Sequence, residues 1–264
     1  MSRLALDFGC GSLKLAGALD TAPGMTGLLI VSGGNEIRSG AFSGQSRLAA
    51  RIAQKGFPVF RFDRRGVGDS EGENRGFRNS QGDIEAALTA FKAMAPQVER
   101  FIGFGNCDAA SALMLMKGTG FDGLVLSNPW TIETDSETAQ SDDDTPPPAA
   151  IRARYAEKLR NPAEWARLVK GGVDLGKLVR GIAKSVRSDA PPSLLADQIR
   201  QGLNAFDGNA RILLASRDRT AQEFERHWDS TDPRISRCEG ASHAYVEPQA
   251  NAWLEAQILA ALRA

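Results

Sequence analysis

The feature that most constrains the fold of this chain is the stretch Phe101–Met116, FIGFGNCDAASALMLM. Its apolar start predicts a short strand, Phe101–Phe104, and its second half, made of small and apolar residues, predicts a helix. The chain must turn sharply at Cys107, and the small residues Gly105 and Ala109 let the strand and helix backbones approach closely there. A cysteine at the first turn of a helix faces free backbone N–H groups and the positive end of the helix dipole, which favour the thiolate. The stretch therefore predicts a nucleophile elbow of the form G-x-C-x-A.

Apolar runs alternate with amphipathic stretches along most of the chain. Two short apolar runs around Gly9-Cys10-Gly11 predict an N-terminal hairpin over Leu4–Leu19. The expected strands are Gly27–Ser32, Pro58–Asp63, Phe101–Phe104, Asp122–Ser127, Ala210–Ser216 and Ile235–Cys238. The expected core helices are Ser43–Lys55, Phe77–Met94 and Asn251–Leu262. This alternation predicts an α/β fold with a mostly parallel central sheet and helices on both faces.

The alternation is interrupted in the second half of the chain. Thr134–Pro148 is acidic, rich in Ser and Thr and ends in consecutive prolines, so it is expected to be a loop. Ala149–Leu168 and Gly181–Phe206 have the composition of helices. We therefore expect a helical cap insertion over 131–206, with the core formed by 1–130 and 207–264. The Arg and Lys residues of the insertion fit a solvated helical surface, and the alternative is a mouth that steers anionic substrates.

Charge and cysteine content exclude several classes of protein. The 264 residues carry 32 basic and 32 acidic side chains, so no overall charge favours nucleic acid or an anionic membrane. The N-terminal sequence is too polar for a signal peptide, and no apolar run reaches the length of a membrane span. Three cysteines cannot all pair and are few for a disulfide scaffold. A soluble, cytoplasmic protein is expected.

Two further residues complete a candidate catalytic group with Cys107. Asp218 follows the expected strand Ala210–Ser216, and His243 lies in a Gly/Ala/Ser loop after the last expected strand. The other histidine, His227, has the surroundings of an ordinary helix or surface residue. All three candidates come at strand ends on one edge of the sheet, so a Cys-His-Asp triad is predicted. The alternative is a buried structural cysteine beside unrelated loop residues.

The sequence resembles the α/β-hydrolase superfamily and, within it, the exosortase A system-associated hydrolases of type 1. The segments that carry this resemblance are GGNEIRSG (Gly33–Gly40), GFPVFRFDRRGVGDSEG (Gly56–Gly72), GFGNCDAASAL (Gly103–Leu113), LSNPW (Leu126–Trp130) and YAEKLRNPAEWARLVKGG (Tyr155–Gly172). Nucleophile, acid and histidine follow the chain order of that superfamily. The resemblance implies triad roles for Cys107, Asp218 and His243, and an association with bacterial exopolysaccharide production and exosortase-based protein sorting.

The resemblance also implies an oxyanion hole. Its donors would be the backbone N–H of Asp108 and one from Gly34 or Asn35, in the turn that follows the first parallel strand. Similar proteins tend to carry Pro-Gln where this chain has Asn35-Glu36. Dienelactone hydrolases, which also use a cysteine, place a Glu near the thiol from an equivalent loop, and Glu36 is the candidate here.

Several residues remain as candidates without an assigned reaction step. The Gly-rich loop Asp63–Ser70 lacks the Lys-Ser/Thr ending of a phosphate-binding P-loop and is interpreted as structural, its charges satisfying one another and the backbone. Candidates for contacts with the substrate are Glu36, Arg38, Trp130, Tyr155 and Trp165. No cofactor is expected, and two histidines with three scattered cysteines make no metal-ligand set of the usual spacing.

The predicted activity is hydrolysis of a small-molecule ester or thioester through an acyl-thioenzyme. Acyl transfer to a sugar or lipid hydroxyl is a second enzymatic interpretation, which the sequence does not separate from hydrolysis. The third is a non-catalytic binding protein that keeps the fold, and it is favoured if Cys107 and His243 lie too far apart for a hydrogen bond.

Overall fold

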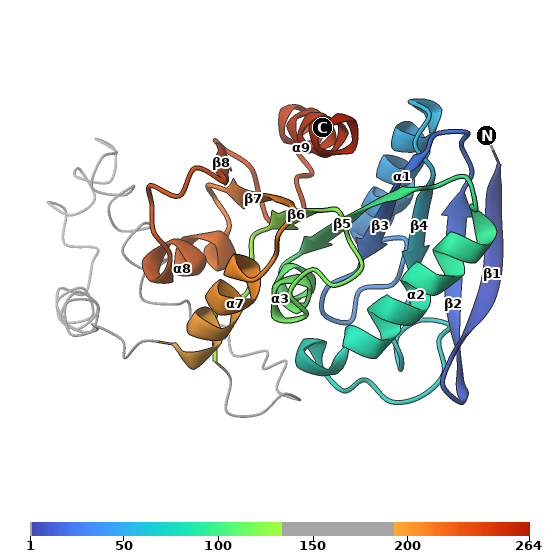
Figure 1. Cartoon of the computed structure of the whole chain (residues 1–264). Helices are drawn as coiled ribbons and strands as arrows, with labels where there is room; N and C mark the ends of the chain where they lie inside the picture. Colours follow the sequence, from blue (N-terminus) through green and yellow to red (C-terminus); the bar gives the residue numbers. More distant parts are fainter. Residues whose placement is uncertain (1, 134–192) are drawn as a thin grey trace, which may run out of the picture.

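The computed structural model describes residues 2–133 and 193–264. Within these ranges the strands form one sheet in the order β1-β2-β4-β3-β5-β6-β7-β8 (Figure 1). The strands are β1 (Arg3–Cys10), β2 (Leu13–Asp20), β3 (Thr26–Val31), β4 (Val59–Phe62), β5 (Arg100–Asn106), β6 (Gly123–Ser127), β7 (Asn209–Ala215) and β8 (Ile235–Cys238). The hairpin β1–β2 and the pair β2–β4 are antiparallel, and the other neighbours are parallel. The predicted hairpin and the mostly parallel sheet are both confirmed.

Helices cover both faces of the sheet, as Figure 1 shows. One face carries α1 (Gly44–Gln54) and α9 (Pro248–Arg263), and the other carries α2 (Gln81–Met94), α3 (Asp108–Leu115), α7 (Leu194–Asn204) and α8 (Arg219–His227). Alternate residues of a strand point to opposite faces, so each face has its own apolar core. Leu28 and Ile30 of β3 share a core with α1 and α9, whereas Leu29 and Val31 share one with α2 and α3. The predicted fold class is confirmed.

Two predicted helices differ from the observed ones at their starts. The stretch Phe77–Met94 is divided into a short 3₁₀ turn, Phe77–Asn79, and α2. Between them the Ser80 hydroxyl donates to the carbonyl oxygen of Phe77 at 2.7 Å and closes the turn. The last helix begins at Pro248, whose missing N–H costs nothing at the first helical position.

Helix α7 lies at the C-terminal end of the range expected for the cap. The range predicted for the cap, 131–206, includes α7, but Leu195, Ile199 and Leu203 are buried in the same apolar core as α3. An amphipathic helix has the same sequence pattern whether it packs on a core or on a cap, so only the tertiary contacts separate the two. Helix α7 packs on α3 in the apolar core beneath the sheet. The rest of the expected cap, 134–192, lies outside the described residues.

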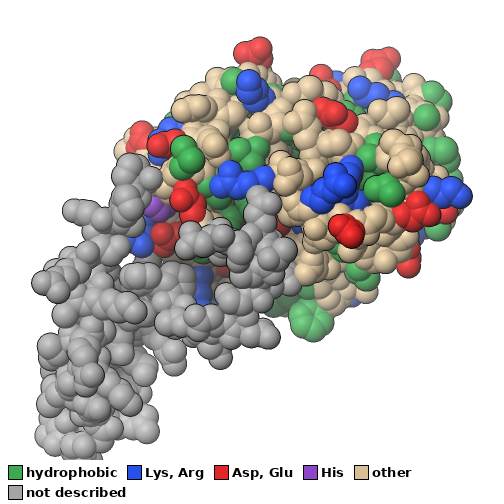
Figure 2. Space-filling model, turned by 90° about the horizontal axis from the view of Figure 1, so that it is seen from below, with side chains coloured by type: hydrophobic (Ala, Val, Ile, Leu, Met, Phe, Trp, Pro, Cys, Tyr) green, Lys and Arg blue, Asp and Glu red, His purple; other side chains and the backbone are tan. Residues whose placement is uncertain are grey.

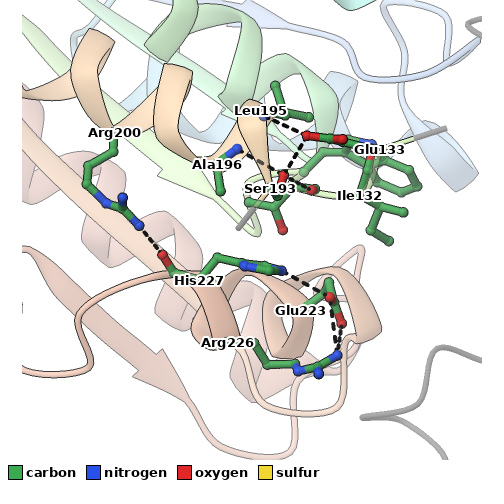
Figure 3. Close-up of polar contacts among 11 residues, drawn as sticks. Ile132, Glu133, Ser193, Leu195, Ala196, Arg200, Glu223, Arg226 and His227 are labelled. Carbon is green, nitrogen blue, oxygen red and sulfur yellow. Dashed lines mark hydrogen bonds and ion pairs between the residues drawn. The ribbon is translucent and has the colours of Figure 1, made fainter. Parts of the chain in front are cut away.

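Polar contacts fix the start of α7 (Figure 3). Glu133 accepts hydrogen bonds from the backbone N–H of Leu195 at 2.9 Å and from the hydroxyl of Ser193 at 3.1 Å. Farther along the helix, Arg200 donates to the backbone carbonyl of His227 at the end of α8. These bonds join residues on the two sides of 134–192 and tie α7 to α8. His227 is a helix-end residue, as predicted.

The described surface carries both signs of charge. On the face shown in Figure 2, Lys and Arg side chains are interspersed with Asp and Glu side chains, in keeping with the balanced composition. Among the helices of residues 2–133 and 193–264, none has an apolar stretch long enough to cross a bilayer.

Candidate active site

Cys107 forms the turn between β5 and α3. Its backbone torsions are φ 62° and ψ −127°, a sparsely populated conformation that costs about 1–3 kcal/mol in a non-glycine residue. The neighbouring strand and loop hold it there. The Cys107 N–H donates to the carbonyl of Ser127 at 2.9 Å, and the Cys107 carbonyl accepts from the N–H of Trp130 at 3.3 Å. The predicted strand, sharp turn and helix are confirmed, and the half-buried thiol is unpaired with any other cysteine.

Small residues let three backbone segments meet at this turn. A Cβ atom placed on Gly105 would lie 2.6 Å from the carbonyl carbon of Ala109, so the strand and the helix meet there without a side chain between them. A Cβ on Gly33 would lie 2.7 Å from the backbone oxygen of Asn106 and 3.6 Å from Cβ of Cys107. The loop after β3 therefore passes directly against the elbow, as expected for a loop that completes the site.

Gly105→Ala is expected to destabilise the protein by about 1–3 kcal/mol, because the added methyl group meets backbone atoms that cannot rotate away. Gly9→Ala is the matched control, since a Cβ at Gly9 meets nothing within 4 Å. The free energy of unfolding in urea, followed by circular dichroism, measures both changes. Equal stabilities of the two variants would show that the strand and helix do not approach as closely as described.

His243 lies beside Asp218, in the relation expected of a triad. Its Nδ1 is 3.0 Å from Oδ1 of Asp218, whose side chain is buried. The second carboxylate oxygen of Asp218 accepts from the N–H of Ala221 at 3.1 Å and caps the start of α8. One carboxylate therefore orients the imidazole while helix α8 fixes the carboxylate. Because Nδ1 faces Asp218, Nε2 is the nitrogen that remains for Cys107.

The electrostatics of His243 favour the imidazolium. Burial lowers the pKa of His243, but hydrogen bonds to Asp218 and to the Cys107 side chain outweigh it and raise that pKa from 6.5 to about 10. His243 is therefore in direct contact with Asp218 at 3.0 Å, and the Cys107 side chain acts on its pKa. A thiolate next to an imidazolium is the arrangement that makes a cysteine a nucleophile.

Two asparagines that the sequence analysis missed hold the His243 loop. Asn106, the last residue of β5, and Asn128, just after β6, both donate to the backbone carbonyl of His243, at 3.2 and 3.3 Å. Asn128 is buried, has a φ of 43°, and accepts from the N–H of Ala215 at 2.8 Å. Asparagine tolerates this left-handed backbone better than most residues. Its only sequence signal was its position in LSNPW, directly after a buried strand.

The Gly34 part of the predicted oxyanion hole needs correction. The N–H of Gly34 donates to Oδ1 of Asp108 at 2.7 Å, so this amide is committed to a carboxylate. The N–H of Asp108, at the start of α3, has no acceptor among the residues the structure describes, and it keeps the expected position at the elbow. Asn35 is the other loop residue predicted as a candidate second donor, and its side chain accepts from Asn74 at 2.7 Å.

Glu36 serves its own loop. Its carboxylate accepts from the N–H of Ala41 at 2.5 Å and from the Gln45 amide at 2.6 Å. Burial raises the pKa of Glu36 above its ordinary value, although the Ala41 bond and the charge of His243 partly oppose this shift. Both of its oxygens have partners other than the thiol, and the structure adds no support for a thiol-activating role like that in dienelactone hydrolases.

The remaining candidates are placed as follows. Arg38 pairs with Asp63 and with Asp69, so its guanidinium braces the Gly-rich loop. The prediction that the charges of this loop satisfy one another is wrong, since Arg64 and Arg65 also pair outside it, with Asp108 and Asp83. Trp130 is half-buried and donates from its indole N–H to the carbonyl of Ile132 at 2.7 Å. Tyr155 and Trp165 lie outside the described residues.

Comparison with known proteins supports the fold. The sequence profile described as Hydrolase_4, serine aminopeptidase, S33 matches residues 26–191. Similar folds occur in an esterase from Pyrococcus furiosus (15% identity, 99% of this chain and 91% of that one, TM-score 0.62) and in the α/β-hydrolase GrgF from Penicillium sp. sh18 (17%, 100% and 98%, 0.64). A third is a serine hydrolase without a lid from Xanthomonas campestris (15%, 100% and 94%, 0.55). No protein of curated function matches the chain.

Sheet order, elbow and family match together define an α/β-hydrolase. Within this class the chain belongs to the serine aminopeptidase S33 family, whose profile spans more than half of it. The family is named for serine, whereas the residue at the elbow of this chain is Cys107.

Proposed function

We propose that this protein hydrolyses an ester or thioester with Cys107 as the nucleophile. The observation that carries the proposal is the 3.0 Å contact of His243 with Asp218, in the loops that follow β8 and β7, on the same sheet edge as Cys107 after β5. The Cys107 side chain is also among the groups that raise the pKa of His243. The interpretation as a non-catalytic binding protein is favoured if Cys107 and His243 lie too far apart for a hydrogen bond; the part that the Cys107 side chain takes in raising the pKa of His243 supports the enzymatic interpretation instead.

The reaction follows from the positions of these groups. The Cys107 sulfur attacks the carbonyl carbon, with its proton on Nε2 of His243, and the C–O π bond opens to an oxyanion. The N–H of Asp108 donates to that oxyanion, a contact worth about 3 kcal/mol. The leaving alcohol or thiol takes the proton from His243. Water then gives a proton to His243 and attacks the acyl-thioenzyme, and the acid and the free thiol are released.

The chemistry fits activated esters, thioesters, lactones and acylated carbohydrates. The sequence resemblance implies an association with bacterial exopolysaccharide production and exosortase-based protein sorting. Of these substrates, acylated carbohydrates fit that association. Cysteine in place of serine makes the acyl-enzyme a thioester, and it makes the enzyme sensitive to alkylation and oxidation.

The test is a panel of short- and medium-chain p-nitrophenyl esters and acyl-thioesters, with mass spectrometry of the protein during turnover. Hydrolysis with an acyl adduct on the peptide that contains Cys107 is the expected result. Aminoacyl p-nitroanilides join the panel because of the family's name. Cleavage of these alone would replace the ester proposal with a peptidase, and partition of the acyl group to added sugar hydroxyls would favour acyl transfer.

A further inference from the structure

The carboxylate of Asp108 joins the elbow to the loop after β3. Asp108 is the residue next to Cys107, and its Oδ1 accepts from the N–H of Gly34 at 2.7 Å. Gly34 has a φ of 54° and follows another glycine, so this turn has unusual conformational freedom unless something fixes it. The loop also lies against the nucleophile, because a Cβ on Gly33 would lie 3.6 Å from Cβ of Cys107.

Arg64 holds the same peptide from its other side. Its Nη2 donates to the carbonyl of Gly34 and lies 3.3 Å from Oδ2 of Asp108. Arg64 is 3% exposed, and its Nη1 has no hydrogen-bond partner in the part of the chain that the structure describes. Burying a guanidinium is costly unless a counter-charge compensates it, and Asp108 is that counter-charge. Burying the Arg64–Asp108 ion pair therefore costs desolvation free energy that an apolar pair packed in the same place would not cost.

We propose that Asp108 and Arg64 are positioning residues that clamp the Gly34 peptide by its N–H and its carbonyl. The clamp keeps the loop after β3 at the distance from Cys107 that oxyanion stabilisation needs. This inference rests on the proposed acyl transfer at Cys107. The Asp108 side chain then has a function separate from that of its backbone N–H, and the Arg64 side chain of the Gly-rich loop helps to hold the Gly34 peptide in the site.

The proposal is tested with Asp108→Ala and Asp108→Asn. Alanine removes the acceptor of the Gly34 N–H. The kcat for ester hydrolysis is expected to fall about 10- to 100-fold with a smaller change in KM, because a displaced loop donor, for which Asn35 is the candidate, weakens stabilisation of the transition state more than binding of the substrate. Asparagine keeps an oxygen that accepts from Gly34, so it is expected to recover most of kcat. Alkylation of Cys107 by iodoacetamide forms no oxyanion and should continue in both variants.

Three outcomes would overturn the clamp. They are a wild-type kcat in Asp108→Ala, equal kcat values for the alanine and asparagine variants, and a loss of alkylation in parallel with hydrolysis. Asp122→Ala is the matched control, because Asp122 also accepts a backbone N–H at 2.7 Å, that of Phe101, at the opposite end of β5. Its kcat is expected to be unchanged.

Hydrogen exchange of the Gly34 amide separates the clamp from the proposed function. In Asp108→Ala and in Arg64→Met this amide is expected to exchange faster by about tenfold or more, whether or not any ester is cleaved, because its bond to the carboxylate or the fixed peptide is lost. If the wild-type protein hydrolyses nothing, the acyl-transfer proposal fails and this readout still decides. An unchanged Gly34 exchange rate in both variants would overturn the clamp by itself.

Discussion

Cys107→Ala should abolish hydrolysis of whichever ester or thioester the wild-type protein accepts, by at least about a thousandfold in kcat. The reason is that no other group can form the covalent intermediate, and His243 without a thiol has nothing to deprotonate. Alanine keeps a Cβ and removes only the sulfur, so the strained turn at φ 62° is disturbed as little as possible. The measurement is the rate on the best substrate of the panel, together with the melting temperature.

Two companion variants sharpen this experiment. Cys10→Ala removes a thiol that contacts Asp83 and Arg65 far along the sheet, in β1, so its activity is expected to match the wild type. Cys107→Ser keeps a hydroxyl nucleophile and is expected to retain a weak activity that iodoacetamide no longer inhibits. If Cys107→Ala hydrolyses the substrate as fast as the wild type, the triad assignment is wrong and the interpretation as a binding protein becomes the favoured one.

The elbow turn and the approach of His243 to Asp218 could be predicted from the sequence because their signals are local. A buried strand, small residues around Cys107 and a helix of small apolar residues fix the turn within a few residues. His243 and Asp218 each follow a short apolar strand, and the carboxyl ends of parallel strands meet at one edge. Their positions at strand ends therefore predict that all three lie on one edge of the sheet.

The contacts of the proposed clamp and of the two asparagines could not be predicted from the sequence, because they join distant segments through single polar atoms. Gly34 and Asp108 are 74 residues apart, and Asn128 and His243 are 115 apart. No periodicity in the sequence indicates such pairs, and an Asn after a strand is just as common in an ordinary turn with no role in a site. Helix α7 was assigned to the cap for a related reason, since its apolar stripe does not say which surface covers it.

Asp218→Asn should lower kcat by about 10²- to 10⁴-fold while leaving the fold in place. Asparagine is as good a helix N-cap as aspartate, so the bond to the N–H of Ala221 and the start of α8 are retained. A neutral amide does not stabilise an imidazolium. Without the charge of Asp218, less remains to offset the effect of burial, which lowers the pKa of His243. That pKa should therefore fall from about 10 toward its ordinary value of 6.5. The measurement is kcat against pH for both proteins, with NMR titration of the His243 ring.

Stability gives an independent check with a defined sign. A histidine whose pKa is raised on folding contributes stability that is fully present below the unfolded value of 6.5 and is lost as the pH rises through about 10. The stability advantage of the wild type over Asp218→Asn in urea should therefore be largest at mildly acidic pH, just below 6.5, and should shrink steadily as the pH rises from there to about 10. The ring is 43% exposed, so solvent screening keeps the advantage small. An advantage that grows as the pH rises, or a kcat within twofold of the wild type, would mean that Asp218 does not hold the imidazolium.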